Sequence, residues 1–357
     1  MFGSAPRLIP PGWSRSTGRG RFFLIVEKAA TLKIGSLTLS NPLLLAPLSG
    51  ISNLPFRLLA KEQGCGMVCT EMISAEGLLR NRKASERLLK SCPEERPLAV
   101  QIFGSNPNSM AEAAKVIEGY GVEVLDINMG CPVRKVVKGG SGAALLKDSK
   151  RVGEILQSVR KGISIPLTVK IRSGWDEKTI NFLEIARVSE ECGVDGLTLH
   201  GRTRTQGYGT EADWEVIAQT KRHLCIPVIG SGDLTSPEAI HHFFARTNAD
   251  GAMIGRGALG NPWIFRQTLQ TLQGLPPEEP SLEEKEKTVL RHLWMMVEFQ
   301  GEVRGSREFR KHLIWYTRGL RGSSEFRSQI YHWETLCEMV GRIQEYFQTL
   351  KNSYLFS

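Results

Sequence analysis

The chain has 357 residues, of which 41% are hydrophobic and 23% charged, and its formal net charge is +9. This composition is ordinary for a folded globular protein. No run of about 18 apolar residues occurs, so no membrane-spanning helix is expected. The excess of positive charge favours a polyanionic partner such as nucleic acid.

The seven cysteines are odd in number and have no regular spacing. A disulfide framework is therefore not expected, and a reducing compartment such as the cytoplasm fits better. Cys65 and Cys69 form a CxxxC pair, but no cluster of His or Cys lies near them in the sequence. We therefore expect no metal site.

Residues 1–21 contain four Arg, three Ser and no acidic residue, a composition that a transit peptide also has. Pro10 and Pro11 would break a helix there, which favours a plain extension or an over-long start site. We expect residues 1–32 to form an N-terminal extension outside the fold.

Eight short apolar runs predict the strands of a barrel. They are Leu43–Leu48, Met67–Met72, Leu98–Phe103, Glu123–Asn128, Leu167–Ile171, Gly196–His200, Ile226–Gly230 and Gly251–Gly255. Most are nearly continuously apolar, as strands buried on both faces are. Amphipathic stretches separate them, so the chain repeats a βα unit with parallel strands. We predict a closed (β/α)8 TIM barrel over residues 33–273; a doubly wound open sheet is the alternative, although no nucleotide fingerprint supports it.

Helix signals lie between these runs. Residues 108–120 carry apolar side chains at helical spacing, and Asp148 is placed to cap the helix that follows it. Ser236, Pro237 and Glu238 combine a cap, a first-turn proline and a first-turn acid. Residues 274–280 are typical of a linker, and residues 281–357 are predicted to form a small C-terminal all-helical domain.

Polar or otherwise unusual residues stand at the carboxyl ends of all eight predicted strands, where such barrels build their active sites. They are Pro47, Leu48, Ser49, Glu71, Gln101, Asn128, Lys170, Arg172, His200, Ser231, Gly232, Asp233, Gly255 and Arg256. One buried polar residue is usually a hydrogen-bonded core residue. Polar residues at the same end of every strand predict a shared polar ligand instead.

The glycine-rich turns after the last two strands expose backbone N–H groups near helix starts, which is typical of a barrel phosphate site. Arg256 could add a charge-assisted contact to a phosphate. Cys131 lies between Gly130 and Pro132 on a loop, a poor position for core packing. We interpret it as a reactive thiol, with an idle loop thiol as the alternative.

These residues resemble the tRNA-dihydrouridine synthases, and the general bacterial branch most closely. The resemblance runs from about residue 33 to 345. Its most specific segment is Asp126-Ile127-Asn128-Met129-Gly130-Cys131-Pro132, and further matching segments are Leu45–Gly50, Gln101–Gly104, Lys170–Trp175, His200–Arg204, Met253–Arg256 and Gly260–Phe265.

The resemblance implies an oxidoreductase that binds FMN, is reduced by NADPH and forms 5,6-dihydrouridine in tRNA. Hydride would pass from the reduced flavin to carbon 6 of uracil, and Cys131 would give the proton to carbon 5. Pro47, Leu48, Ser49, Gln101, Lys170 and His200 are implied to lie around the flavin ring, and Ser231, Gly232, Asp233, Gly255 and Arg256 at its phosphate. Asn128 and Arg172 would face the substrate.

The C-terminal segment is rich in cations, and we expect Arg310, Lys311, Arg318 and Arg321 to contact tRNA phosphates. A solvated helix face is the alternative. The enzyme is expected to be a cytoplasmic monomer without metal. Two other functions stay open: a flavin barrel that reduces a free pyrimidine or another small unsaturated substrate, and a non-catalytic RNA-binding protein that retains the barrel.

Overall fold

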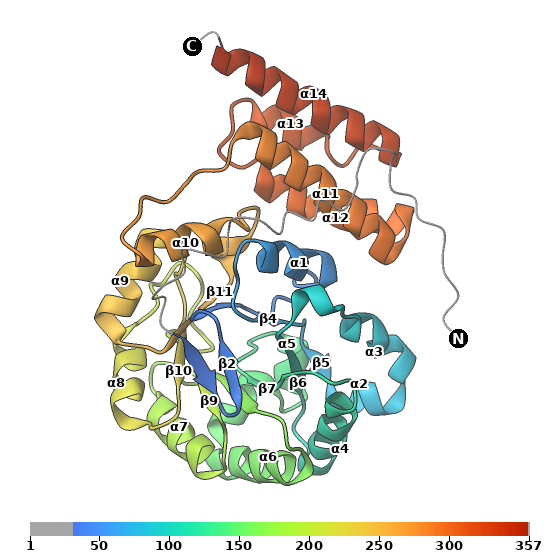
Figure 1. Cartoon of the computed structure of the whole chain (residues 1–357). Coiled ribbons are helices and arrows are strands. Elements are labelled where there is room, and N and C mark those ends of the chain that lie inside the picture. The colour runs from blue at the N-terminus through green and yellow to red at the C-terminus, as the bar shows by residue number, and fades with distance from the viewer. Residues whose placement is uncertain (1–30, 356–357) are drawn as a thin grey trace.

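The computed structural model describes residues 31–355. Of the expected N-terminal extension, residues 1–32, only residues 31 and 32 lie within this range. The centre of the structure is a ring of parallel strands surrounded by helices, and a group of helices packs on one side of it (Figure 1). The eight barrel strands are β3 (Leu43–Leu45), β4 (Val68–Cys69), β6 (Leu98–Phe103), β7 (Val124–Met129), β8 (Leu167–Arg172), β9 (Gly196–His200), β10 (Val228–Ser231) and β11 (Gly251–Ile254).

All eight predicted strands are confirmed, and the sheet has the order β3-β11-β10-β9-β8-β7-β6-β4. The ring closes between β3 and β4 through a parallel bridge from Leu44 to Met67, where the amide of Leu45 donates to the carbonyl of Met67 at 3.0 Å. The short strand β5 (Ile73–Ser74) extends the pairing with β6. The closed parallel barrel, rather than the open sheet, is therefore the fold.

Helices follow the strands around the outside of the barrel (Figure 1). They are α1 (Leu54–Glu62), α2 (Ala75–Arg80), α3 (Arg82–Leu89), α4 (Pro107–Glu118), α5 (Arg134–Lys138), α6 (Ser149–Gly162), α7 (Phe182–Glu191), α8 (Glu215–His223), α9 (Pro237–Thr247) and α10 (Ile264–Leu272), with short 3-10 helices η1 (Pro93–Glu95), η2 (Gly142–Lys147) and η3 (Arg256–Ala258). The predicted caps are present: Asp148 accepts from the amide of Arg151, and Ser236 accepts from that of Ala239.

A hairpin that the sequence analysis did not anticipate closes the amino-terminal end of the barrel. It consists of β1 (Leu32–Ile34) and β2 (Leu37–Leu39), and its turn uses Gly35 at φ 56°. Its buried side chains pack against the first residues of the barrel strands, and Leu32 lies so close to β11 that a Cβ at Gly251 would sit 2.9 Å from it. Leu32, expected in the extension, is thus the first residue of this hairpin.

Four helices form the C-terminal region: α11 (Leu282–Gln300), α12 (Glu302–Tyr316), α13 (Ser323–Gln329) and α14 (Leu336–Leu355). They have a separate apolar core, to which Trp263 from the barrel side contributes. Gly260, at φ 66°, meets the end of α12 so closely that a Cβ there would lie 2.3 Å from the Trp315 carbonyl carbon. Residues 274–280 form neither helix nor strand.

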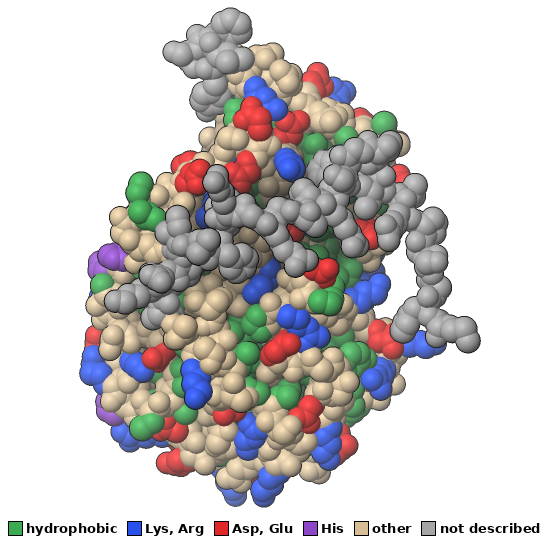
Figure 2. Space-filling model, in the orientation of Figure 1, with side chains coloured by type: hydrophobic (Ala, Val, Ile, Leu, Met, Phe, Trp, Pro, Cys, Tyr) green, Lys and Arg blue, Asp and Glu red, His purple; other side chains and the backbone are tan. Residues whose placement is uncertain are grey.

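Two further findings concern membrane-spanning helices and surface charge. No helix within residues 31–355 combines the length and apolar character that crossing a bilayer requires. Acidic and basic side chains alternate over the barrel face that Figure 2 turns to the viewer, where the hairpin lies. A face of mixed charge is a poor binding surface for a polyanion.

Two buried histidines lie where the barrel meets the helical region. His292 on α11 and His312 on α12 have ring centroids 4.4 Å apart, and Phe56 of α1 lies against both rings. Burial lowers the pKa of His292 to about 3, with a smaller effect from the Lys311 charge. Burial and the neighbouring His292 also lower the pKa of His312. Both rings are therefore neutral in the folded chain at neutral pH.

This cluster predicts acid sensitivity. The unfolded chain takes up protons at these histidines below about pH 6.5, while the folded chain does not. The free energy of unfolding should therefore fall as the pH drops from about 6.5 toward 3, by up to about 1.4 kcal/mol per pH unit for each histidine. Urea unfolding at several pH values measures this slope. His292→Gln should flatten it, whereas replacing the exposed His332 with Asn should not; equal slopes would contradict the prediction.

Candidate active site

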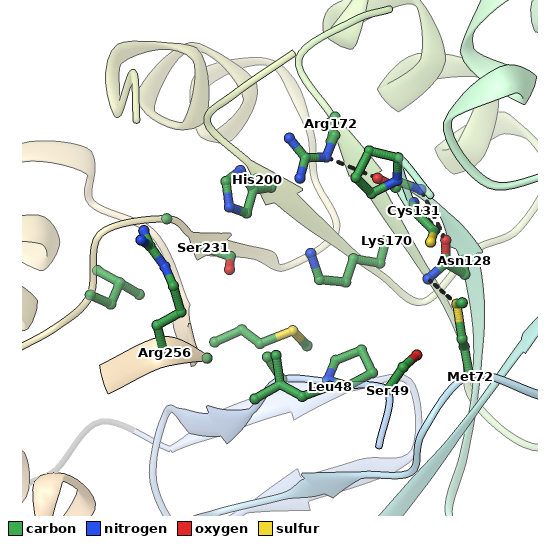
Figure 3. A pocket seen from close by; sticks show the side chains of 18 of the residues that line it. Leu48, Ser49, Met72, Asn128, Cys131, Lys170, Arg172, His200, Ser231 and Arg256 are labelled. Atoms are coloured by element: carbon green, nitrogen blue, oxygen red, sulfur yellow. Dashed lines mark hydrogen bonds between the residues drawn. The ribbon is translucent and has the colours of Figure 1, made fainter. Parts of the chain in front are cut away.

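One pocket opens at the carboxyl ends of the barrel strands (Figure 3). The barrel residues that the sequence predicts for catalysis, the cofactor and the substrate all line it: Pro47, Leu48, Ser49, Gln101, Asn128, Cys131, Lys170, Arg172, His200, Ser231, Gly232, Asp233, Gly255 and Arg256. Met72, Pro132, Tyr208 and Thr235 also line it. Glu71, expected at the end of the second strand, does not line it, because its carboxylate accepts from the amide of Gly50 instead. The parallel register explains the convergence, because the same end of every strand faces the same rim.

A chain of hydrogen bonds rises from the barrel interior to the Cys131 loop. Thr168 and Gln101 donate to the two carboxylate oxygens of Asp126 at 2.6 and 2.7 Å. The Asn128 amide donates to Gln101 at 2.7 Å and accepts from the backbone amide of Cys131 at 2.9 Å. All of these donors and acceptors are buried or half-buried, so each bond is screened little by water.

Cys131 is half-buried in the loop after β7 and points into the pocket (Figure 3). Burial raises the pKa of its thiol, although the backbone of Val133 and the charges of Arg172 and Lys170 oppose this effect. The group therefore stays protonated at neutral pH. A protonated thiol held in a pocket is suited to donate a proton and poorly suited to act as a resting nucleophile.

Arg172 secures the same loop from the neighbouring strand. Its guanidinium donates to the carbonyl of Gly130 at 2.9 Å and to that of Thr203 at 2.7 Å. These two bonds tie the loop after β7 to the loop after β9. Arg172 thus lines the pocket, but two of its donors are already used by the protein itself.

Lys170 and His200 give the pocket an unusual charge state. Lys170 makes no hydrogen bond or ion pair with any residue between 31 and 355, and burial, followed by repulsion from Arg172, lowers its pKa to about 8. Burial and the same cations lower the pKa of His200 far below its usual range, so its ring is neutral, and its Nδ1 has no partner in the described chain. A half-buried cation that lines a pocket and has no partner predicts an anionic or strongly polar ligand.

The opposite end of the pocket is suited to a phosphate. The backbone amides of Gly232, Asp233 and Gly255 donate to no described residue. Gly232 and Asp233 have φ of 119° and 55°, the positive values that turn successive amides toward one point. Arg256 lies beside them with its side chain 38% exposed.

The carboxylate of Asp233 is occupied by two arginines. Its carboxylate pairs with Arg202 at 2.6 Å and with Arg256 at 2.7 Å. Hydrogen bonds from Arg202 and the amide of Ala212 lower its pKa against the effect of burial. The carboxylate therefore orients two arginines, and only the backbone amide of Asp233 can face an anion.

The sequence analysis did not anticipate the contacts of cations with the rings of Tyr208, which lines the pocket, and of Trp175. Tyr208 is 62% exposed, and the Arg256 guanidinium lies 4.2 Å from its ring centroid. Lys147 and Arg204 lie 3.5 and 4.6 Å from the ring of Trp175. Asp126 carried a detectable signal, a single carboxylate within an apolar strand, whereas the pairings of Tyr208 and Trp175 depend on loop conformation.

Three exposed cations lie on α5, which follows the Cys131 loop. Arg134, Lys135 and Lys138 are exposed and take part in no ion pair within the described chain. They lie three to seven residues after Cys131, which itself lines the pocket. Within residues 31–355 no three His, Cys, Asp or Glu side chains cluster as metal ligands would.

The four cations predicted in the helical region lie outside the pocket and differ in availability. Arg318 and Arg321 are exposed. The Lys311 ammonium lies 3.7 Å from the position that a Cβ on Gly50 would take, so it borders the loop after β3. Arg310 donates to the carbonyl of Trp333, and its Nε is buried, which ties α12 to the segment before α14.

The profile of one protein family matches the chain. The family is described as "Dihydrouridine synthase (Dus)", and the match covers residues 44–352. "tRNA-dihydrouridine synthase B" of Pseudomonas syringae pv. tomato is 40% identical over 321 residues, which cover 89% of this chain and 95% of the relative. The protein of the same name from Pasteurella multocida is 42% identical over 83% of this chain and 90% of the relative. The "Probable tRNA-dihydrouridine synthase" of Rickettsia bellii is 38% identical over 90% and 99%.

Solved structures share the fold at much lower identity. A 2-naphthoyl-CoA reductase complex superposes with a TM-score of 0.54 at 14% identity over 70% of this chain and 52% of that one. A 6-hydroxypseudooxynicotine amine oxidase from Pseudomonas geniculata superposes with a TM-score of 0.55 at 14% identity over 74% and 52%. The chain thus spans about half the length of these structures, and the likeness shows the fold alone.

Proposed function

Because this chain belongs to the dihydrouridine synthase family, we propose that it reduces uridine to 5,6-dihydrouridine in tRNA, with FMN as the bound cofactor and NADPH as the reductant. The observation that carries this proposal is the pocket itself, which combines a protonated thiol, a half-buried ammonium without a partner in the described chain and a cluster of free backbone amides. A non-catalytic RNA-binding protein would have no use for that combination.

The pocket residues fit FMN by their chemistry. The free amides of Gly232, Asp233 and Gly255 and the Arg256 guanidinium suit a phosphate monoester. Lys170 suits the polar edge of an isoalloxazine ring, where a cation favours electron-rich forms. Pro47, Leu48 and Ser49 offer backbone and apolar contacts beside the ring. When bound, the flavin supplies the two electrons that saturate the uracil double bond.

Cys131 would supply the proton for carbon 5 of the uracil. Its raised pKa keeps the thiol protonated until the proton is transferred to carbon 5. The contacts of Asn128 and Arg172 hold the loop in place. Neutral His200 adds no second charge beside Lys170. The second N–H of Asn128 faces the Met72 sulfur at 3.8 Å (Figure 3), which leaves the rim of the pocket to orient the base.

The tRNA would lie across the mouth of the barrel and touch two cationic surfaces. One consists of Lys311, Arg318 and Arg321 in the helical region, and the other of Arg134, Lys135 and Lys138 on α5. A free pyrimidine as substrate, the rival function, would need neither surface. A monomer suffices, since one chain contributes every pocket residue, and a tRNA substrate fits a cytoplasmic enzyme.

The purified protein should be yellow and should release FMN on denaturation. Arg256→Ala should weaken FMN retention by about tenfold to a hundredfold, because a charge-assisted phosphate contact contributes about 1.5–3 kcal/mol. Fluorescence of the released flavin measures retention. Arg222→Ala removes a surface arginine that pairs with Glu215 and serves as the matched control. Release of FAD, or unchanged retention in Arg256→Ala, would contradict the cofactor assignment.

Cys131→Ala should leave flavin reduction by NADPH intact and slow the reduction of tRNA by about 10²–10⁴-fold. The reason is that only the second half-reaction consumes a proton from the protein. Stopped-flow absorbance follows both half-reactions separately. Replacing the exposed Cys225 with Ala should change neither. An equal loss in both half-reactions would mean that Cys131 has a structural role.

The two cationic surfaces should govern tRNA affinity without changing flavin reduction. The triple variants Lys311/Arg318/Arg321→Ala and Arg134/Lys135/Lys138→Ala should each weaken binding, and each lost phosphate contact should reduce the slope of log affinity against log salt by about one unit. Fluorescence anisotropy across a salt series gives the slopes. A control triple of Lys161, Arg187 and Arg246, exposed on the outer helices, should bind normally. An unchanged slope in one variant would exclude that surface.

A further inference from the structure

In the chain of hydrogen bonds beneath Cys131, each side-chain amide has only one orientation that sets its donors against acceptors. At the upper end of this chain, the Asn128 side-chain oxygen accepts from the backbone amides of Gly130 and Cys131 at 3.2 and 2.9 Å. A backbone N–H can only donate, so this end of the Asn128 amide must be its oxygen. Its Nδ2 therefore faces Gln101, 2.7 Å away.

The same donor-to-acceptor order continues from Asn128 into the barrel interior. Gln101 is fully buried and must present Oε1 to Asn128, so its Nε2 must find an acceptor on the other side. That acceptor is Asp126, paired with Gln101 in the register of β6 and β7, at 2.7 Å. The second carboxylate oxygen of Asp126 accepts from Thr168 on β8 at 2.6 Å.

We propose that Asp126 is a positioning residue for Cys131. As a hydrogen-bond acceptor it sets the orientation of the Gln101 amide, Gln101 sets that of Asn128, and Asn128 holds the loop that carries Cys131. The proposal rests on the proposed function only in giving Cys131 the proton-donating role. Asp126 itself lies one layer below the pocket, since it does not line it.

Exchanging donors and acceptors along this chain of hydrogen bonds provides a test. In Asn128→Asp, the new carboxylate still accepts from both backbone amides, but its second oxygen now faces Gln101 Oε1. If Gln101 turns to donate upward, its Oε1 faces the Asp126 carboxylate instead. While both carboxylates are ionised, two acceptors oppose each other in a buried site either way, which costs the full desolvation of an unsatisfied group. Because burial raises the pKa of Asp126, the variants are compared at mildly alkaline pH, where this carboxylate is ionised.

Adding Asp126→Asn removes this conflict. The amide introduced at position 126 can donate to Gln101 Oε1 while still accepting from Thr168, and Gln101 Nε2 can donate to the carboxylate introduced at position 128. Each link of the reversed chain then joins a donor to an acceptor, and the number of carboxylates equals that of the wild type. Asp126→Asn alone should be mild, because the new amide can accept from Gln101 and donate to the Thr168 hydroxyl oxygen.

Hydrogen exchange at the amides of Gly130 and Cys131 in the holoenzyme is the direct measurement, with tRNA reduction as the second readout. Asn128→Asp should raise exchange at both amides by about tenfold or more, because its carboxylate can relieve the conflict with Gln101 only by turning away from these amides, and it should slow tRNA reduction. Asn128→Asp/Asp126→Asn should recover most of both losses. A urea unfolding midpoint for each variant separates this local effect from a failure to fold.

Gln101→Met serves as the control background. Methionine is similar in length to glutamine but has no amide, so it cannot link the hydrogen-bonding choice at position 126 to that at position 128. In this background, Asp126→Asn should give Asn128→Asp no recovery. A double variant no better than Asn128→Asp would overturn the proposal. Recovery that persists with Met at position 101 would also overturn it, by showing a direct effect of charge. If Cys131→Ala leaves tRNA reduction unchanged, the proposed function loses its proton donor, whereas the exchange result is unaffected.

Discussion

Closure of the parallel barrel is the constraint on which the rest of the structure depends. Pairing of β3 with β4 at Leu44 and Met67 completes the ring, so the carboxyl ends of all eight strands surround one opening. Residues more than 200 positions apart, such as Ser49 and Arg256, thereby line the same pocket. An open sheet with the same strands would spread these side chains along an edge and leave Lys170 in water, with its pKa unperturbed.

The enclosed pocket also determines how charge is distributed. Burial keeps the Cys131 thiol protonated, keeps His200 neutral and leaves Lys170 as a cation with a lowered pKa. Each polar group that the protein itself satisfies supports the loops: Asp233 orients two arginines, and Arg172 joins two loops. The groups left unsatisfied, Lys170 and the amides near Gly232, are those that suit a flavin phosphate and ring. This division between satisfied and unsatisfied groups is what separates the supporting residues from the binding residues.

The proposed function draws on family membership and on this geometry in different ways. Family membership supports the reaction and the tRNA substrate, while the geometry supports the role proposed for each side chain. One cationic surface follows the Cys131 loop in sequence, and the other includes Lys311, which borders the loop after β3. The barrel face at the hairpin carries mixed charge, so an RNA would be drawn to the mouth by both shape and potential.

The sequence by itself determined the eight strands, their parallel arrangement, two helix caps and the residues at the strand ends, because hydrophobic periodicity and capping are local signals. Only the tertiary structure decided that Arg310 binds the carbonyl of Trp333, that the Asp233 carboxylate pairs with arginines, and that Leu32 begins a hairpin. It also decided that Asp126 reaches Asn128 through Gln101. These are pairings between segments distant in sequence, and a partner's identity is not encoded in the local pattern of either segment. Their donors and acceptors meet only after the barrel has closed.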